Sequence, residues 1–266
     1  MKKGKVLCVY SPKGGVGKSI ISANIAGSSY LMGKRTLLID ADLYDGGLSL
    51  FVNKEIKKNI YTLSNDIKNN KYESILDYVY NYNEGLDILC STKIAQQHYN
   101  TFKERFEGYP IRVEVLSRFK TPKQQKQIIE DAKNIYDFIV IDTNSSYNDF
   151  NENIFNLCDE VLLILTNDIV NIKNMKNVIT MFNDIGIYKY KVLYNSAFDF
   201  KDQYFSYEEM IDIIGANIDY TILREGFFKN ITGYLFNNKI PILYKNNDVQ
   251  YYSLLNKCNL IINDME

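Results

Sequence analysis

Short runs of apolar residues alternate with longer amphipathic stretches along most of the chain. Most of these apolar runs are continuous, which is typical of a strand that is buried on both faces of a parallel sheet. The clearest runs cover residues 6–9, 36–39, 86–90, 138–141, 161–165, 192–194 and 218–223. Between several of them, apolar residues recur at helical spacing. The pattern therefore predicts an α/β fold: a doubly wound, mostly parallel sheet with helices on both faces.

The alternation continues to the end of the chain without a linker-like stretch, which predicts a single domain over residues 1–266. Residues 60–83 have a mixed pattern and are expected to be helical. Residues 93–120 are the least regular, with a polar, helix-like piece followed by an alternating, strand-like segment at 111–115.

Several helix boundaries follow from local chemistry. Thr121 and Pro122 form a good helix start, because threonine caps helices and proline is tolerated in the first turn. Ser206 and Glu209 have capping-box spacing. Two final helices are expected near residues 227–237 and 248–262.

A glycine-rich segment, S-P-K-G-G-V-G-K-S at residues 11–19, follows the first apolar run. A helical pattern follows it, and strand, glycine-rich turn and helix is the context that a phosphate-binding loop requires. Gly14, Gly15 and Gly17 lack Cβ atoms, so the backbone amides can approach phosphate oxygens. The N-terminus of the following helix also favours negative charge.

Lys18 and Ser19 complete this loop. Lys18 supplies a compact positive charge to β- and γ-phosphates, and the Ser19 hydroxyl is a ligand that Mg²⁺ accepts. The ordinary G-x-x-x-x-G-K-[ST] pattern has a glycine where this chain has Pro12. A second lysine, Lys13, stands directly before the glycines instead.

Two further apolar runs end in carboxylates. Asp40 and Asp42 follow the run at 36–39, and Asp142 follows the run at 138–141. The carboxyl ends of parallel strands meet at the edge of the sheet where ligands bind. Asp142 has the Walker B pattern of an aspartate that holds Mg²⁺ through water. Asp40 is expected beside the Mg²⁺ site, with a strand-end cap or salt bridge as the alternative.

The K-G-G-V-G-K-S sequence resembles the deviant Walker A motif of the MinD/ParA superfamily of P-loop ATPases. The resemblance implies that the chain binds ATP and Mg²⁺ and forms a homodimer with the nucleotide between the subunits. It implies that Lys13 reaches the partner's nucleotide and that Asp42 lies by the attacking water, so Lys13, Lys18 and Asp42 are the candidate catalytic residues. It also implies that Asn195 reads the adenine edge; a turn-forming asparagine is the alternative.

The candidate ligand contacts form two sets. The expected nucleotide contacts are Lys13, Gly14, Gly15, Val16, Gly17, Lys18, Ser19, Ile20 and Asn195. The expected Mg²⁺ ligands are Ser19, Asp142 and Asp40.

The turn after Asp142 departs from the superfamily. Relatives usually have a Pro- and Gly-containing turn there, whose glycine amide senses the γ-phosphate, but this chain has Thr143-Asn144-Ser145-Ser146. A serine or asparagine amide still donates, without the backbone freedom of glycine. The sequence therefore predicts ATP binding, but it does not decide whether the protein hydrolyses ATP. An ATPase switch and a non-hydrolysing, ATP-bound scaffold are both kept as hypotheses.

Within the superfamily, S-P-K-G-G-V-G and the switch-like segment at 40–48 are most similar to the CpaE/TadZ branch of pilus-assembly localisation factors. Many members of that branch carry a receiver-like domain that this sequence lacks. The resemblance implies a protein partner in a membrane-associated pilus or secretion assembly, and recruitment to the membrane or cell pole through that partner. ParA-type DNA partition and MinD-type division-site ATPases are the alternatives.

The net charge of the chain bears on the DNA-partition alternative. The net charge of −1 and the pI of about 6.0 argue against a strongly nucleic-acid-binding chain. A local basic stretch contains Arg112, Arg118, Lys120, Lys123 and Lys126. It is expected to be a solvated face, with docking to an acidic partner or lipid headgroups as the alternative.

Several features predict a cytoplasmic protein. The sequence has no signal peptide, no apolar run long enough to span a bilayer and no basic amphipathic helix at its C-terminus. The four cysteines are far apart, without a C-x-x-C pair, and are expected to be buried, reduced thiols. His98 is the single histidine, which excludes a metal site built from several histidines.

Overall fold

The fold is described from a computed structural model of the chain. The structure describes residues 3–43, 46–53, 56, 58–91, 121–196, 205–223, 231–245 and 249–266. The irregular segment at 93–120, with His98 and most of the basic stretch, lies outside the described residues.

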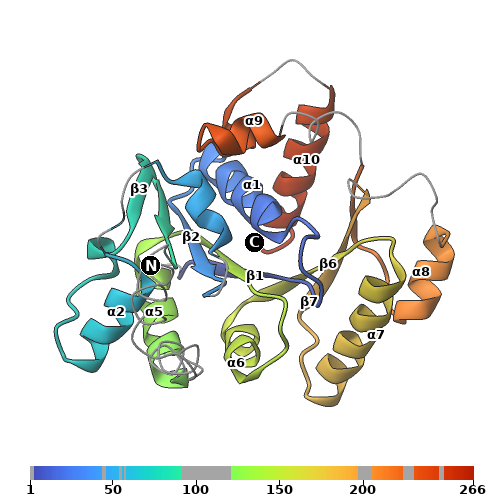
Figure 1. Ribbon diagram of the computed structural model, residues 1–266, viewed down its shortest axis with the longest axis horizontal. Helices are drawn as coiled ribbons and strands as arrows, with labels where there is room; N and C mark the ends of the chain where they lie inside the picture. The colour runs from blue at the N-terminus through green and yellow to red at the C-terminus, as the bar shows by residue number, and fades with distance from the viewer. Residues whose placement is uncertain are drawn as a thin grey trace, which may run out of the picture.

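An eight-stranded sheet forms the centre of the molecule (Figure 1). Its strands are β1 (Lys5–Tyr10), β2 (Thr36–Ala41), β3 (Tyr80–Asn83), β4 (Leu86–Leu89), β5 (Phe138–Thr143), β6 (Glu160–Leu165), β7 (Tyr190–Asn195) and β8 (Tyr220–Ile222). Their order in space is β3-β4-β2-β5-β1-β6-β7-β8. Every pair of neighbours is parallel except β3 and β4, so the predicted doubly wound, mostly parallel sheet is confirmed.

Helices cover both faces of this sheet (Figure 1). One face carries α1 (Lys18–Leu31), the 3₁₀ turns η1 (Gly47–Phe51) and η5 (Pro241–Leu243), α9 (Ile231–Phe236) and α10 (Val249–Asn263). The other face carries α2 (Ile60–Lys68), the 3₁₀ turn η2 (Ile75–Asp77), α5 (Pro122–Ile135), α6 (Asp149–Leu157), α7 (Ile169–Asp184) and α8 (Tyr207–Ile214).

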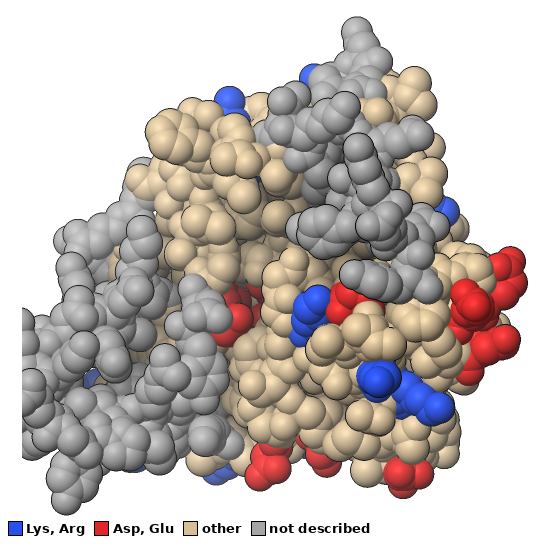
Figure 2. Space-filling model, turned by 45° about the vertical axis from the view of Figure 1, so that its right-hand side comes forward, with Lys and Arg blue, Asp and Glu red and all other residues tan. Residues whose placement is uncertain are grey.

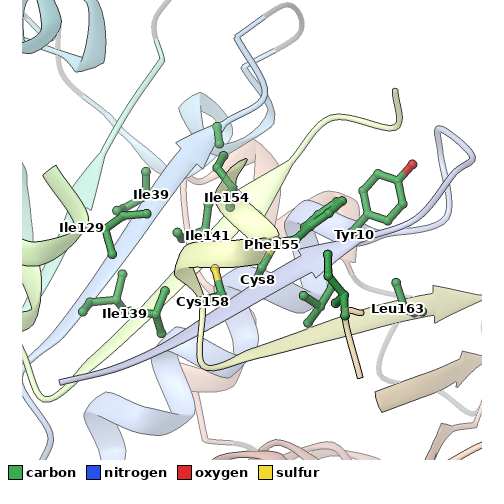
Figure 3. Packing of buried hydrophobic residues seen from close by; sticks show 14 of the residues in the cluster. Cys8, Tyr10, Ile39, Ile129, Ile139, Ile141, Ile154, Phe155, Cys158 and Leu163 are labelled. Carbon is green, nitrogen blue, oxygen red and sulfur yellow. The ribbon is translucent and has the colours of Figure 1, made fainter. Parts of the chain in front are cut away.

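The continuous apolar runs are explained by two separate cores. Leu7 and Val9 of β1 pack on the side of α1, whereas Cys8 and Tyr10 pack on the side of α6. Figure 3 shows the second core, where the rings of Tyr10 and Phe155 meet edge to face with centroids 5.0 Å apart. In the central strands, side chains on both faces are buried, so no polar face interrupts the apolar run.

The four cysteines are free and buried, as expected. Cys8 and Cys158 lie in the core of Figure 3. Burial raises the pKa of Cys258 to about 12. A thiol in such surroundings stays neutral and unreactive.

The prediction of a helical segment over residues 60–83 is wrong in its second half. Helix α2 ends at Lys68, and residues 80–83 form the edge strand β3, which pairs antiparallel with β4. The turn between these strands contains Gly85 at φ 100°, a conformation that glycine adopts without strain. Edge strands are exposed on one side, so β3 lacks the continuous apolar run that marks the central strands.

The predicted helix starts are confirmed in position. Ser206 and Glu209 form the expected capping box at the start of α8. Helix α5 begins at Pro122, but the Thr121 hydroxyl donates to the Gln124 side chain (2.9 Å) and makes no capping hydrogen bond to the backbone.

The last helix, α10, belongs to the core. Tyr251, Leu254, Cys258 and Ile261 are buried, and Asn259 accepts a hydrogen bond from Ser28 of α1 (2.7 Å). Its apolar side is therefore covered by this chain. Within the described ranges, no helix is both long and apolar enough to cross a membrane.

Candidate functional site

The glycine-rich loop connects the carboxyl end of β1 with the start of α1. Gly15 and Gly17 have φ angles of 76° and 91°, which L side chains rarely adopt, so the loop requires glycine at these two positions. Gly17 is also the N-cap of α1. Asn171 of α7 donates to the Ser11 hydroxyl (2.9 Å), so a hydrogen bond links the beginning of the loop to α7.

Lys18 is buried at the start of α1, and its ammonium lies at the carboxyl edge of the sheet. The ammonium donates to the Ser145 hydroxyl, with a Nζ–Oγ distance of 2.7 Å. Ser145 lies in the turn after β5, the strand next to β1. The structure thus brings the predicted phosphate-binding lysine against the unusual turn.

Lys13 points toward the other neighbour of β1. Its ammonium forms an ion pair with Asp168 (2.9 Å), which follows β6 and caps α7. Burial alone would raise the pKa of Asp168, but Lys13 and hydrogen bonds from the Asn171 amide and the Thr166 hydroxyl hold it below its usual value. The Lys13 side chain keeps 38% of its surface exposed, so it is accessible from outside.

Asp40 and Asp142 are direct neighbours on β2 and β5, and both are fully buried. Asp40 accepts hydrogen bonds from the amides of Asp42 (3.1 Å) and Leu48 (3.3 Å). Burial and the nearby Asp142 charge raise its pKa. Burial likewise raises the pKa of Asp142 to about 6, although Ser19, Lys18 and Ser22 act in the opposite direction. Two adjacent buried carboxylates require a nearby positive charge to stay ionised at neutral pH.

The surroundings of Asp142 fit a magnesium ion. Its Oδ1 accepts from Ser22 (3.2 Å), but its Oδ2 has no hydrogen-bond partner among the described residues. Gly47 closes the site from the switch-like segment: a Cβ there would lie 2.5 Å from the Ser19 Oγ and 4.0 Å from this Oδ2.

The described residues hold no cluster of three or more His, Cys, Asp or Glu side chains that would bind a metal by themselves. Ser19 and Asp142 would therefore supply a minority of the ligands. Mg²⁺ in nucleotide sites is bound in this way, with phosphate oxygens and waters completing the shell.

Most of the predicted site residues lie at one edge of the sheet. Gly14, Val16 and Ile20 belong to the loop and the first turn of α1, and Asp42 follows β2 beside Asp40. Asn195 ends β7, and its amide donates to the Val16 carbonyl (3.0 Å). Asn195 therefore braces the loop, and its contact with adenine stays a prediction.

Sequence reasoning missed the roles of Ser22, Asp168 and the Ser145 hydroxyl. Ser22 lies one helical turn after Lys18 and Ser19, a spacing that predicts the same face of α1. Asp168 follows a buried strand in an N-cap position, which is a detectable signal for the same sheet edge.

The comparisons with known proteins support the fold and the family. A family model described as "AAA domain" (AAA_31) matches residues 4–195. The structure is similar to a ParA family ATPase from Chlorobium tepidum TLS, with a TM-score of 0.77, 18% identity and coverage of 97% and 99% of the two chains. It is also similar to the septum site-determining protein MinD complexed with Mg-ADP from Pyrococcus horikoshii OT3, with a TM-score of 0.73, 17% identity and coverage of 97% and 96%.

A short stretch matches a different kind of protein. It is 53% identical over 53 residues to a transcription-repair-coupling factor of Haemophilus influenzae. The match covers 20% of this chain and 5% of that protein, so the chain spans only a small part of the curated relative's length.

The family model covers well over half of the chain, including the loop, the aspartates and Asn195. The chain belongs to the AAA_31 family of AAA domains, and it shares the doubly wound fold of the ParA family ATPase and of MinD.

Proposed function

We propose that this protein is an ATP-binding switch that forms a homodimer around Mg·ATP. The observation that carries the proposal is the convergence of Lys18, Ser19 and the unpartnered Asp142 Oδ2 at the end of the loop. A buried lysine and a buried carboxylate with one oxygen that no described residue contacts by a hydrogen bond form a site whose charges match a phosphate chain with its metal.

Each residue of this site would have its own role in binding Mg·ATP. Lys18 and the loop amides would hold the phosphates, while Ser19 and Asp142 would hold Mg²⁺ with Asp40 behind them. Asp42 would orient the attacking water. The bound Mg²⁺ would supply positive charge that offsets the phosphate oxygens.

Nucleotide binding is tested with fluorescent ATP and ADP, with Mg²⁺ and with a chelator. We expect both nucleotides to bind and the affinity for ATP to fall on removal of Mg²⁺. Absence of binding at millimolar nucleotide would contradict the proposal.

Lys13 is the residue that would connect two subunits. Its exposure allows it to reach a partner's phosphates, but it must first leave the ion pair with Asp168. The ion pair therefore opposes dimer formation in this structure. Such a partly exposed pair contributes up to about 1 kcal/mol.

Asp168→Asn is expected to strengthen the ATP-dependent dimer by about threefold to fivefold. Asparagine caps a helix about as well as aspartate, so α7 keeps its start while Lys13 loses its anionic partner. Light scattering over a range of protein concentrations measures the dimer dissociation constant. Asp149→Asn, at an exposed position in the first turn of α6, is the matched control. Unchanged or weaker dimerisation in Asp168→Asn would show that the pair does not restrain Lys13.

We further propose that the dimer positions a membrane-associated machine of the pilus or secretion type, from the cytoplasm and through a protein partner. The loop and the switch-like segment at 40–48 support this through their resemblance to the CpaE/TadZ branch. On the face shown in Figure 2, the Lys and Arg side chains of the described residues lie in small separate groups, so this face gives no support for DNA binding. MinD-type membrane binding through α10 is also unsupported, because its apolar side is buried.

A second candidate is a scaffold that binds ATP without hydrolysing it. The turn after Asp142 favours it, because Thr143-Asn144-Ser145-Ser146 stands where relatives usually have a Pro- and Gly-containing turn, so the backbone freedom of glycine is missing. Nucleotide that stays bound through purification, with no phosphate release, would favour the scaffold over the switch.

A further inference from the structure

The Ser145 side chain lies directly beside the phosphate-binding loop. Its Oγ is 2.7 Å from the Lys18 Nζ and 4.0 Å from the position that a Cβ on Gly14 would take. Its carbonyl accepts a hydrogen bond from the Tyr10 hydroxyl (3.4 Å), which anchors the backbone to β1. The hydroxyl therefore faces the place where the loop and Lys18 would meet a phosphate chain.

The turn that carries Ser145 is fixed without glycine or proline. Asn151 of α6 is fully buried, and its Nδ2 donates to the carbonyl of Ser146 (2.6 Å) and to the Oδ1 of Asn144 (3.1 Å). The same Oδ1 of Asn144 accepts from the Ser146 amide (2.9 Å). Because the residues on both sides are held, Ser145 has a defined position before any ligand arrives.

We propose that the Ser145 hydroxyl contacts the terminal phosphate of ATP and makes the site prefer ATP over ADP. The inference rests on the proposed function and adds a recognition residue to the same site. The loop amides would hold the phosphates nearer the nucleoside, whereas Ser145 approaches from the neighbouring strand end and would meet the phosphate that projects beyond the loop. It would act in place of the turn glycine that the sequence lacks.

The hydrogen-bonding capacity of Ser145 fits this role. A hydroxyl has one donor hydrogen and two acceptor sites, so accepting from Lys18 leaves the hydrogen available for a phosphate oxygen. Two acceptors of one ammonium lie about 4 to 5 Å apart, so a phosphate oxygen on Lys18 comes within hydrogen-bond distance of Ser145 when the Lys18 and Ser145 side chains change their rotamers. ADP has no terminal γ-phosphate and would not make this contact.

The test compares the affinities for fluorescent ADP and a fluorescent, non-hydrolysable ATP analogue in excess Mg²⁺. The variants are Ser145→Ala and Ser145→Thr, with Ser146→Ala as the matched control in the same turn. We expect Ser145→Ala to lose about tenfold in affinity for the ATP analogue, the size of one hydrogen bond to a charged group, and less than about twofold for ADP. Ser145→Thr keeps a hydroxyl and is expected to retain most of the preference, and Ser146→Ala is expected to retain all of it.

An unchanged ratio of the two affinities in Ser145→Ala would overturn the inference while leaving nucleotide binding intact. A wild-type protein that binds neither nucleotide would overturn the proposed function and this inference together. Thermal unfolding of each variant shows whether it is folded. Should Ser145→Ala not fold, the same comparison is made between Ser145→Thr and Ser145→Val, which have the same shape and differ in the hydroxyl; equal ratios in that pair would also overturn the inference.

Discussion

Replacing Lys18 with alanine is expected to reduce the affinity for Mg·ATP by about a hundredfold or more. The ammonium is the one buried positive charge at the end of the described loop, next to Ser145 and near Asp142. Its loss removes charge-assisted hydrogen bonds to phosphate oxygens, which together contribute about 3 kcal/mol of binding free energy. Titration with a fluorescent ATP analogue measures the change.

Lys176→Ala provides the matched control for this experiment. Lys176 is an exposed lysine on α7, so its replacement removes the same charge without touching the loop. The control is expected to bind ATP like the wild type. A Lys18→Ala protein that is folded and keeps wild-type affinity would exclude the loop as the nucleotide site.

Asp142→Asn is expected to make the metal-free protein more stable at neutral pH and to weaken the Mg²⁺ dependence of ATP binding. Burial raises the pKa of Asp142 from 3.8 to about 6, so between these values the folded state binds more protons than the unfolded state. The free energy of unfolding of the wild type therefore falls as the pH rises from about 4 to 6 and then levels off. At pH 7.5 the ionised carboxylate costs about 2 to 3 kcal/mol, which asparagine avoids.

Urea denaturation between pH 5 and pH 8, in the presence of a chelator, measures this effect. The gain from Asp142→Asn is expected to grow toward pH 7 and to shrink below pH 5. Asp77→Asn, at an exposed carboxylate in η2, is the control and is expected to change little. A variant less stable than the wild type throughout this range would contradict the assigned destabilising role of the buried charge.

The sheet could be predicted from the sequence because its central strands are buried on both faces. Most of them contain a continuous apolar run, and the loop and the aspartates lie at the ends of β1, β2 and β5. The edge strand β3 could not be predicted in the same way, because it is half exposed and rich in Tyr and Asn. Its assignment depends on pairing with β4 through the Gly85 turn, which is a tertiary interaction.

The partners of the two lysines also required the structure. In space β1 lies between β5 and β6, although both strands are more than a hundred residues away in sequence. This order places Ser145, which follows β5, against Lys18, and Asp168, which follows β6, against Lys13. The sequence shows that each segment ends at the ligand edge, but it does not show which strands are neighbours.

Light scattering combined with phosphate release tests the central claim most directly. Wild type and Asp42→Ala are compared with and without saturating Mg·ATP. The switch account predicts a monomer of 30.9 kDa without nucleotide and a dimer with Mg·ATP in both proteins, with phosphate release by the wild type alone. A dimer without phosphate release in either protein would favour the scaffold. A monomer in both proteins at saturating Mg·ATP would contradict the ATP-dependent dimer on which the account depends.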